Sequence, residues 1–476
     1  MEISQINFLL PEIALSIMIL AMFCVSLARP GRINLNSLAL ILSAISLAAA
    51  LFSFGKTGLL FFGTYKVDGL SQIFKVIITF GLFLVIATTP GVHGIEKRLR
   101  AEYYMFIAIG TLGLVCLASS FELLTLVMSL EISAFALNVI IPFRCLDSGR
   151  CQMEAAIKYF LFGVVSTGVM LYGMSYIFGL AKTTYLHELA VTLPEMLSHE
   201  PMAVIGVIMM FCGFFFKLSM FPMHFLTPDV YQGSANETAT LLATLPKIAA
   251  VAVLIRLVGL TGTETGNLTW LLATFAILSM TVGNLAALVQ EDLKRLLAYS
   301  AIAHAGYVMI GILCVNELGF AAAIYYMGGY LVMTLSCFHV IYQLAQKGEN
   351  LTFQDLKGLH RRSPLLAFTL AAGAFGLAGI PPTIGFTGKF LLFTAAISKG
   401  YYTLVILAVI NAAISAFYYL KIVRAAYCQP EEEEDPVLLS LPAKLLAIFF
   451  IASTILAGIL PQSFISLAKQ AVAYLI

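Results

Sequence analysis

Long apolar runs, each about 20 residues in length and separated by short polar segments, recur along the whole chain. A run of that length spans the hydrocarbon core of a bilayer as an α-helix. Fourteen runs can be marked, with approximate cores at 7–28, 34–54, 69–89, 102–119, 121–142, 152–181, 202–222, 238–258, 268–290, 295–315, 318–345, 364–398, 402–420 and 440–461. The pattern therefore predicts an all-α polytopic membrane protein with about 14 transmembrane helices.

One segment between the second and third runs departs from this pattern. The stretch 53–68, SFGKTGLLFFGTYKVD, is polar and punctuated by glycines, and its centre is β-like. Such a segment is typical of a short β-hairpin outside the membrane.

The first residues, MEISQINFLLPEIALSIMIL, contain no basic segment and no cleavage site. They predict a first spanning helix rather than a cleaved signal peptide.

The amino-acid composition also indicates an integral membrane protein. Hydrophobic residues make up 60% and charged residues 11%, whereas a soluble domain carries roughly 25% charged residues. The net charge of +2 gives no reason to expect nucleic-acid binding. The eight cysteines form no CxxC motif or Cys/His cluster, so we expect no metal site. No flavin, iron–sulfur or nucleotide motif is present, so we expect no cofactor in this chain.

The distribution of lysine and arginine predicts the orientation. Sixteen of these residues fall in predicted loops on one side and six fall on the other side. The side with more positive charge is expected to be cytoplasmic. Both termini are then expected on the periplasmic side, which is consistent with an even number of helices.

The five remaining basic residues lie inside apolar runs: Lys75, Lys158, Lys217, Lys247 and Lys389. An ionisable group at membrane depth is costly unless it reaches the interface, pairs, or meets water. Lys75 lies near the outer end of its helix and is expected to snorkel. Lys158 either snorkels or lines an inlet. We expect the other three lysines to be functional.

One acidic residue and three polar residues complete the candidate set. Glu131, in LLTLVMSLEISAFAL, lies too deep in its run for either end to be within reach. It is either a titratable site or a protonated carboxyl that is hydrogen-bonded inside the bundle. His224, Tyr299 and His304 are candidate proton relays, and His304, in LAYSAIAHAGYVMIG, could equally be structural.

Prolines interrupt the seventh and twelfth runs, in FFFKLSMFPMHFLTPDVY and GIPPTIGFTGKF. Proline frees backbone carbonyls, and in lipid these must find protein or water partners. Discontinuous helices of this kind occur in transporters. Because the breaks lie five helices apart, they predict two five-helix units, the second inverted. We divide the chain into 1–100 (helices 1–3), 101–260 (first unit), 261–425 (second unit) and 426–476 (loop and helix 14).

At these residues the chain resembles the antiporter-like, proton-translocating membrane subunits of respiratory complex I. The similar segments are LEIS, AAIKYFL, FKLSMFPMHFLTPDVYQG, LPKIAA, LKRLLAYSAIAHAGY and GIPPTIGFTGKF. Within the family, TPDVYQG resembles the N type more than the L or M type. The sequence departs from the family at SANETATLLA, where a proline-bearing stretch is usual and where Glu237 adds an acid near the cytoplasmic mouth of helix 8.

The resemblance implies roles for several residues. Glu131 and Lys217 would form a charged pair, Lys247 would be the central relay, and Lys389 would be the site of the second half. FMN, iron–sulfur clusters and quinone would be bound by partner subunits. The partners would be an M-like antiporter subunit and small K- and J-like subunits, in the lipid bilayer of a bacterial inner membrane.

Two other readings remain open from the sequence. The chain could be a subunit of a related Na⁺/H⁺ antiporter or of a membrane-bound hydrogenase. Alternatively, it could be a structural membrane anchor in which the buried charges only fix helix packing.

Overall fold

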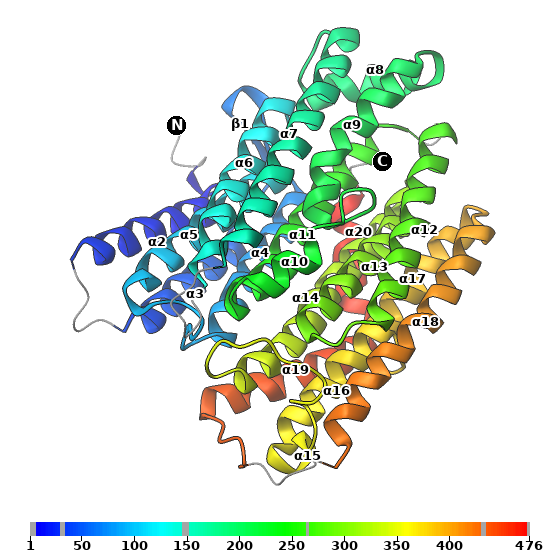
Figure 1. Ribbon diagram of the computed structural model, residues 1–476. Coiled ribbons are helices and arrows are strands. Elements are labelled where there is room, and N and C mark those ends of the chain that lie inside the picture. The colour runs from blue at the N-terminus through cyan, green and yellow to red at the C-terminus, as the bar shows by residue number, and fades with distance from the viewer. Residues whose placement is uncertain (1–5, 29–33, 145–151, 263–265, 430–434, 474–476) are drawn as a thin grey trace.

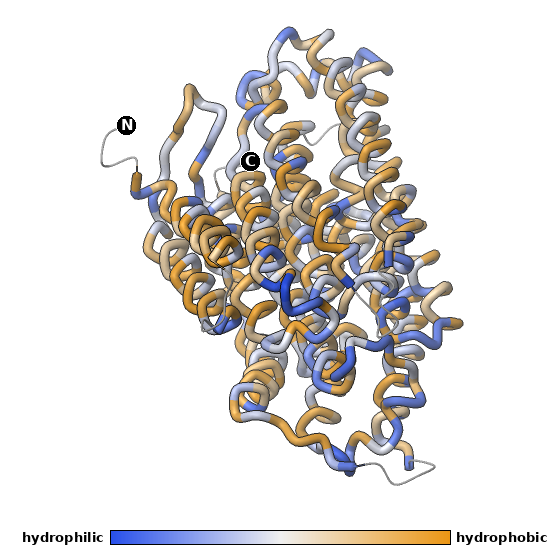
Figure 2. Tube along the Cα trace, turned by 60° about the vertical axis from the view of Figure 1, so that its left-hand side comes forward, coloured by the Kyte–Doolittle hydropathy of each residue, from blue (hydrophilic) through white to orange (hydrophobic). Residues whose placement is uncertain are grey.

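A computed structural model describes residues 6–28, 34–144, 152–262, 266–429 and 435–473 as a bundle of long helices (Figure 1). Apolar residues run along these helices, and hydrophilic residues gather mainly in the connecting segments (Figure 2). In the described part of the chain, thirteen helices are long and apolar enough to cross a membrane. They are α2 (Leu10–Leu27), α3 (Leu35–Ser53), α4 (Gly69–Thr88), α5 (Arg100–Ser119), α6 (Leu123–Ile140), α7 (Met153–Ala181), α9 (Pro201–Leu218), α11 (Asn236–Gly259), α12 (Gly266–Leu288), α13 (Leu293–Leu313), α14 (Glu317–Leu344), α18 (Tyr402–Tyr427) and α19 (Leu441–Ile459).

The two predicted broken helices are confirmed. Helix 7 consists of α9 and the short α10 (Thr227–Gly233). Helix 12 consists of α16 (Pro364–Ala378) and α17 (Ile384–Ser398), each too short to cross alone. Together α16 and α17 make the fourteenth crossing, in agreement with the sequence.

The two breaks share the same local geometry. Ser219 after α9 and Gly379 after α16 both have left-handed backbone conformation, with φ of 62° and 84°. Pro222 and Pro382 each follow a cis peptide bond. Ser219 and Pro222 are three residues apart in the first break, and Gly379 and Pro382 are three residues apart in the second. The breaks therefore correspond residue by residue, even though the surrounding units show little sequence similarity.

Loops at the two ends of the bundle establish that the units are inverted. At the end that carries the hairpin and α8, Tyr65 bridges to Ser120 and Glu122 bridges to Tyr185. At the opposite end, which carries α15, Asp292 bridges to Thr352. The helix α9 begins at the hairpin end and α16 begins at the α15 end (Figure 1). The two broken helices therefore cross the bundle in opposite directions.

The predicted hairpin is confirmed, and several short elements were not predicted. Strands β1 (Gly58–Leu60) and β2 (Tyr65–Val67) pair antiparallel, with Gly58 opposite Val67. The unpredicted helices are α8 (Leu186–His199), α15 (Leu359–Arg362), α20 (Gln462–Val472), and the 3-10 turns η1 (Phe61–Gly63), η2 (Lys97–Leu99) and η3 (Ile141–Phe143). The C-terminal part thus contains a further helix after helix 14.

The helix α11 is the most enclosed element of the bundle. Its whole membrane-crossing window is buried, compared with 22% of the window of α3 or α19. A helix that is apolar around its circumference is expected in such a position. Any charged group on α11 must therefore find its partners inside the protein, which makes Lys247 the most constrained of the candidates.

Candidate functional site

Lys217 and Glu131 face one small cavity in the first unit. The cavity, of about 70 Å³, is bounded by α6, α7 and α9. The Lys217 ammonium donates to the Tyr159 hydroxyl at 3.1 Å and lies 5.1 Å from the centre of that ring. The Thr167 hydroxyl donates to Glu131 at 2.7 Å. The two charged groups thus share a cavity, and each is bound to a hydroxyl group of α7.

The ammonium of Lys247 is held at the break in helix 7. Lys247 is 2% exposed. It donates to the Leu218 carbonyl at 3.0 Å and to the Ser219 hydroxyl at 2.6 Å. Leu218 is the last residue of α9, and carbonyls at a helix C-terminus have no partner within the helix and carry partial negative charge. The break therefore supplies the acceptors that allow a cation in the centre of the bundle.

Lys389 occupies a matching position at the break in helix 12. Its ammonium donates to the carbonyls of Leu377 and Ala378, at 3.0 and 2.9 Å. It also lies 4.7 Å from the centre of the Tyr307 ring, where a cation–π contact is favourable. In both units an ammonium binds the C-terminus of a half-helix. The lysine comes from the neighbouring helix in the first unit and from the broken helix itself in the second.

His304 lies on α13, inside the second unit. It is 4% exposed. Its Nδ1 is 2.5 Å from the Tyr326 hydroxyl and its Nε2 is 3.0 Å from the Tyr419 hydroxyl. Lys247 and Lys389 are both close enough to act on it electrostatically. Both ring nitrogens therefore contact hydroxyl groups that can donate and accept protons, and the relay role of His304 stays a prediction.

Two asparagines extend this polar region and were missed by the sequence analysis. Asn284 donates to the side chain of Asn411 at 3.3 Å and lies 3.4 Å from the Tyr307 hydroxyl. The Tyr418 hydroxyl donates to Asn284 at 2.9 Å. The only signal in the sequence is an amide in the middle of each of two apolar runs, since no charge marks these positions.

Lys158 lines a polar cavity of about 430 Å³ at the α15 end of the bundle. Its ammonium pairs with Glu154 at 2.6 Å and with Asp229 at 3.0 Å. Arg295 binds the other oxygen of Asp229 at 2.7 Å. Lys158 thus lines a polar cavity while its side chain stays partly exposed, and its role as an inlet residue stays a prediction.

His224 and Tyr299 are not brought into contact with the buried lysines. The His224 ring packs against Phe221 and Phe225, with ring centres 5.4 and 4.3 Å away. Tyr299 is half-buried and lies beside Arg295. The relay roles of both residues stay predictions.

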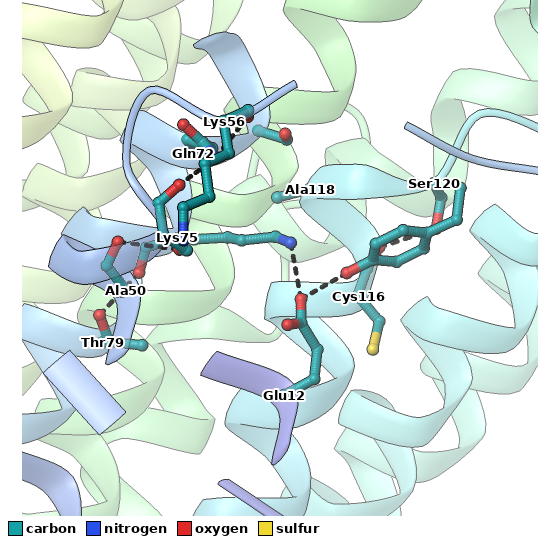
Figure 3. A network of polar contacts seen from close by, with 12 residues as sticks. Glu12, Ala50, Lys56, Gln72, Lys75, Thr79, Cys116, Ala118 and Ser120 are labelled. Atoms are coloured by element: carbon teal, nitrogen blue, oxygen red, sulfur yellow. Dashed lines mark hydrogen bonds and ion pairs between the residues drawn. The ribbon is translucent and has the colours of Figure 1, made fainter. Parts of the chain in front are cut away.

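The prediction that Lys75 snorkels is wrong. Lys75 is 1% exposed and its ammonium lies 2.6 Å from Glu12. Figure 3 shows the Lys75 side chain reaching the Glu12 carboxylate, and the Tyr65 hydroxyl also donates to Glu12. The acidic partner is in the first helix, 63 positions earlier in the chain, so spacing in the sequence could not reveal the pair.

Two basic residues that were counted among the loops are also buried. Arg256 in α11 makes a two-pronged ion pair with Asp68, at 2.9 and 3.0 Å. Burial alone would raise the pKa of Asp68, but the Arg256 guanidinium overcomes this effect and lowers the pKa to about 2. Lys294 is fully buried and donates to the Ser234 carbonyl at 2.8 Å.

The fold and the site together define a class of membrane proteins. Two inverted units, each with a broken helix whose C-terminus binds a lysine, are the features of antiporter-like ion-translocating subunits. Residues 120–415 match the family model described as NADH:quinone oxidoreductase/Mrp antiporter, transmembrane.

Comparison with named relatives identifies one family within this class. NADH-quinone oxidoreductase subunit N 2 of Syntrophobacter fumaroxidans is 45% identical over 91% of both chains. The protein of the same name from Opitutus terrae is 45% identical over 96% of both chains. This chain belongs to the family of NADH-quinone oxidoreductase subunit N.

Solved structures agree with this assignment. A chain of respiratory complex I from Thermus thermophilus superimposes with a TM-score of 0.82 and 31% identity, over 96% of this chain and 99% of that one. A chain of the Mrp complex from Dietzia superimposes with a TM-score of 0.86 over 99% of this chain and 97% of that one. At 16% identity, the Dietzia match shows a shared fold alone.

Proposed function

We propose that this chain is the proton-translocating subunit N of a bacterial NADH-quinone oxidoreductase. The observation that carries the proposal is the pair of buried ammonium groups, Lys247 and Lys389, each bound to the C-terminus of a half-helix. His304 and its tyrosines lie between them. Quinone reduction elsewhere in the complex drives proton transfer through these sites.

The chain acts within an assembly. FMN, iron–sulfur clusters and quinone belong to partner subunits. An M-like antiporter subunit and small K- and J-like subunits are the neighbours in the membrane arm. The chain lies in the bacterial inner membrane with both termini on the periplasmic side.

Glu131 and Lys217 form the first transfer site in this proposal. Each now contacts a hydroxyl of α7 across the same cavity, so a small movement brings them together or apart. When they approach, the carboxylate favours the charged lysine; when they separate, the lysine gives up its proton more readily. The proton leaves Lys217 for the next site, Lys247.

The energies show why a row of sites is needed. Separating an ammonium–carboxylate pair from about 4 to about 8 Å at an effective dielectric constant near 20 changes their attraction by about 2 kcal/mol. Moving one charge through a membrane potential of order 150 mV costs about 3.5 kcal/mol. A single pair is therefore insufficient, and Lys247, His304 and Lys389 share the remaining work.

Alanine variants at the first transfer site test the proposal. Lys217→Ala and Glu131→Ala should leave the complex assembled and lower the number of protons pumped per electron. The ratio is measured in sealed vesicles, with NADH oxidation as the electron count. A normal ratio in both variants would sink the proposal.

Co-migration tests membership of the complex independently of pumping. A tagged chain from the native host, gently solubilised, should run on a native gel with a very large NADH-oxidising assembly. If it ran with a small assembly that lacks this activity, Na⁺/H⁺ exchange would become the better reading and Na⁺-dependent transport in vesicles would be measured next.

A further inference from the structure

Glu237 is a buried carboxyl group that the proposed mechanism does not use. It lies in the first turn of α11, at the α15 end of the bundle, and is fully buried. Its Oε1 accepts a hydrogen bond from the Gly94 amide at 3.2 Å. Its Oε2 has no hydrogen-bond partner among the described residues. The carboxylate is therefore only half satisfied inside the protein.

A thin cover separates this carboxyl group from the surface. Gly94 belongs to the loop between α4 and α5 and packs against Gly348 so closely that a side chain on Gly348 would meet the backbone of Gly94. The neighbouring His93 is exposed, and its ring lies 5.1 Å from that of Tyr342. Tyr342 in turn is close enough to Glu237 to interact electrostatically. One loop thus stands between Glu237 and the aqueous phase.

Two cationic side chains lie near Glu237 but donate their hydrogen bonds to other groups. Arg144 and Lys294 are within electrostatic range of the carboxyl group. Arg144 donates to the carbonyls of Gln232 and Gly348, and Lys294 donates to that of Ser234. Among the described residues, therefore, neither Arg144 nor Lys294 forms an ion pair with Glu237, although both lie near it.

Other titratable groups that act in this region are Asp292, Glu349, Arg100, Tyr103 and Tyr104. Unpartnered polar atoms also gather here: within the described chain, Asn236 Oδ1, Arg144 Nε and Asn350 Oδ1 have no hydrogen-bond partner. Buried polar atoms without protein partners are as a rule bound to water. The region is suited to hold water beneath the loop.

A polar stripe leads from Glu237 toward the centre of the bundle. Glu237, Thr240, Thr244 and Lys247 follow one another at intervals of three, four and three residues, which places them on one face of α11. All four are buried. The threonine hydroxyls donate to carbonyls one turn earlier, at 2.7 and 2.9 Å, and their oxygens remain able to accept. The stripe rises about 15 Å along the helix.

We propose that Glu237 is a proton-loading group for Lys247. Its carboxylate takes a proton from water beneath the Gly94 loop and releases it along the threonine stripe, through intervening water, to the neutral amine of Lys247. The inference rests on the proposed function, because Lys247 must be a transfer site. It adds a loading route on the basic side of the membrane.

Charge removal at Glu237 tests the proposal in the whole complex. Glu237→Gln should reduce several-fold the part of the proton-to-electron ratio that passes through this subunit. The rate of electron transfer in the presence of an uncoupler should stay normal. Glu237→Asp should retain most of the pumping. Glu96→Gln, an exposed acid on the covering loop, is the matched control and should behave as wild type.

A spectroscopic readout separates proton loading from a structural role. Infrared difference spectra between two pH values should show a buried carboxylic-acid band that disappears in Glu237→Gln and survives in Glu96→Gln. If Glu237→Gln pumped normally and lost no band, the inference would be wrong. If Glu237→Gln failed to assemble, the double variant Thr240→Val with Thr244→Val would test the route instead. An unchanged proton-to-electron ratio in that double variant would overturn the proposed route.

The two proposals fail in different ways. A normal ratio in Glu237→Gln together with a lowered ratio in Lys247→Ala overturns only the loading route. A normal ratio in both variants overturns the proposed function itself.

Discussion

At the scale of single residues, Lys75 is held by a different kind of partner from Lys247 and Lys389. Lys75 binds the full charge of the Glu12 carboxylate, whereas Lys247 and Lys389 bind main-chain carbonyls at helix ends. A helix terminus carries about half a charge, so it attracts a cation less strongly than a full carboxylate charge does. The first arrangement suits a structural role and the second suits proton exchange.

The pairing of Glu12 with Lys75 should stabilise the N-terminal helices. Removing one partner of a buried ion pair costs about 3–5 kcal/mol because the other charge is left uncompensated. We expect Glu12→Ala to lower the melting temperature of the purified protein in detergent, and Glu12→Ala with Lys75→Met to restore much of the loss. A double variant no more stable than Glu12→Ala would contradict the ion pair.

Individual site residues were predictable where a full charge interrupts an apolar run. Lys217, Lys247, Lys389 and Glu131 stand out for that reason. Glu12 did not, because it lies near the start of its helix, in the first turn of α2, where an acidic residue is common. Whether a buried lysine has a partner depends on which helices meet, and a single sequence does not contain that information.

At the scale of elements, the half-helices α16 and α17 meet at a contact that only glycine permits. A side chain on Gly385 would lie 1.8 Å from the Gly376 carbonyl oxygen. Because Gly376 is near the end of α16, separating the halves would pull Lys389 away from its carbonyls. The lysine and the helix end therefore depend on this glycine contact.

Gly385→Ala tests this dependence. We expect the variant to lower the proton-to-electron ratio, and to lower the melting temperature, while Lys389 itself is unchanged. Gly168→Ala is the control, since a side chain there meets nothing within 4 Å. Normal pumping in Gly385→Ala would show that the position of the half-helices does not matter for transfer.

The ion pair between Asp68 and Arg256 joins the start of α4 to the end of α11 and makes a pH-dependent contribution. The pKa of Asp68 is lowered to about 2 in the folded protein, from about 4 in an unfolded chain. A lowered carboxyl pKa gives stability that is present above pH about 4 and lost as the pH falls toward 2, amounting to about 2 kcal/mol.

The Asp68→Asn variant should reveal this contribution. At neutral pH it should melt at a lower temperature than wild type, and the difference should shrink as the pH is lowered below about 4. A difference that stayed constant across this range would mean that the Asp68 charge does not contribute.

Elements long enough to cross the membrane were predictable, and short ones were not. The helices α8 and α20 have 14 and 11 residues and one polar face each, so they contain no apolar run of spanning length. Prolines marked the breaks, but they did not show that the second half of helix 7 is only the seven-residue α10.

At the scale of the whole molecule, the candidate sites form a row through both units. Glu131 and Lys217 lie in the first unit, Lys247 on the enclosed α11, His304 on α13, and Lys389 in the second unit. Inversion of the units places one half-helix C-terminus, with its bound lysine, in each half of the row. The two breaks predicted this arrangement from sequence, whereas the tyrosines and asparagines around His304 in the second unit became evident only from packing.

The central claim is that protons pass through the buried lysines, and Lys247 is the position that tests it most directly. The measurement is the number of protons pumped per electron by the purified complex in sealed vesicles, for wild type, Lys247→Ala and the exposed control Lys399→Ala. We predict a lower ratio in Lys247→Ala alone, with electron transfer preserved when an uncoupler is present. An unchanged ratio in Lys247→Ala would contradict the account.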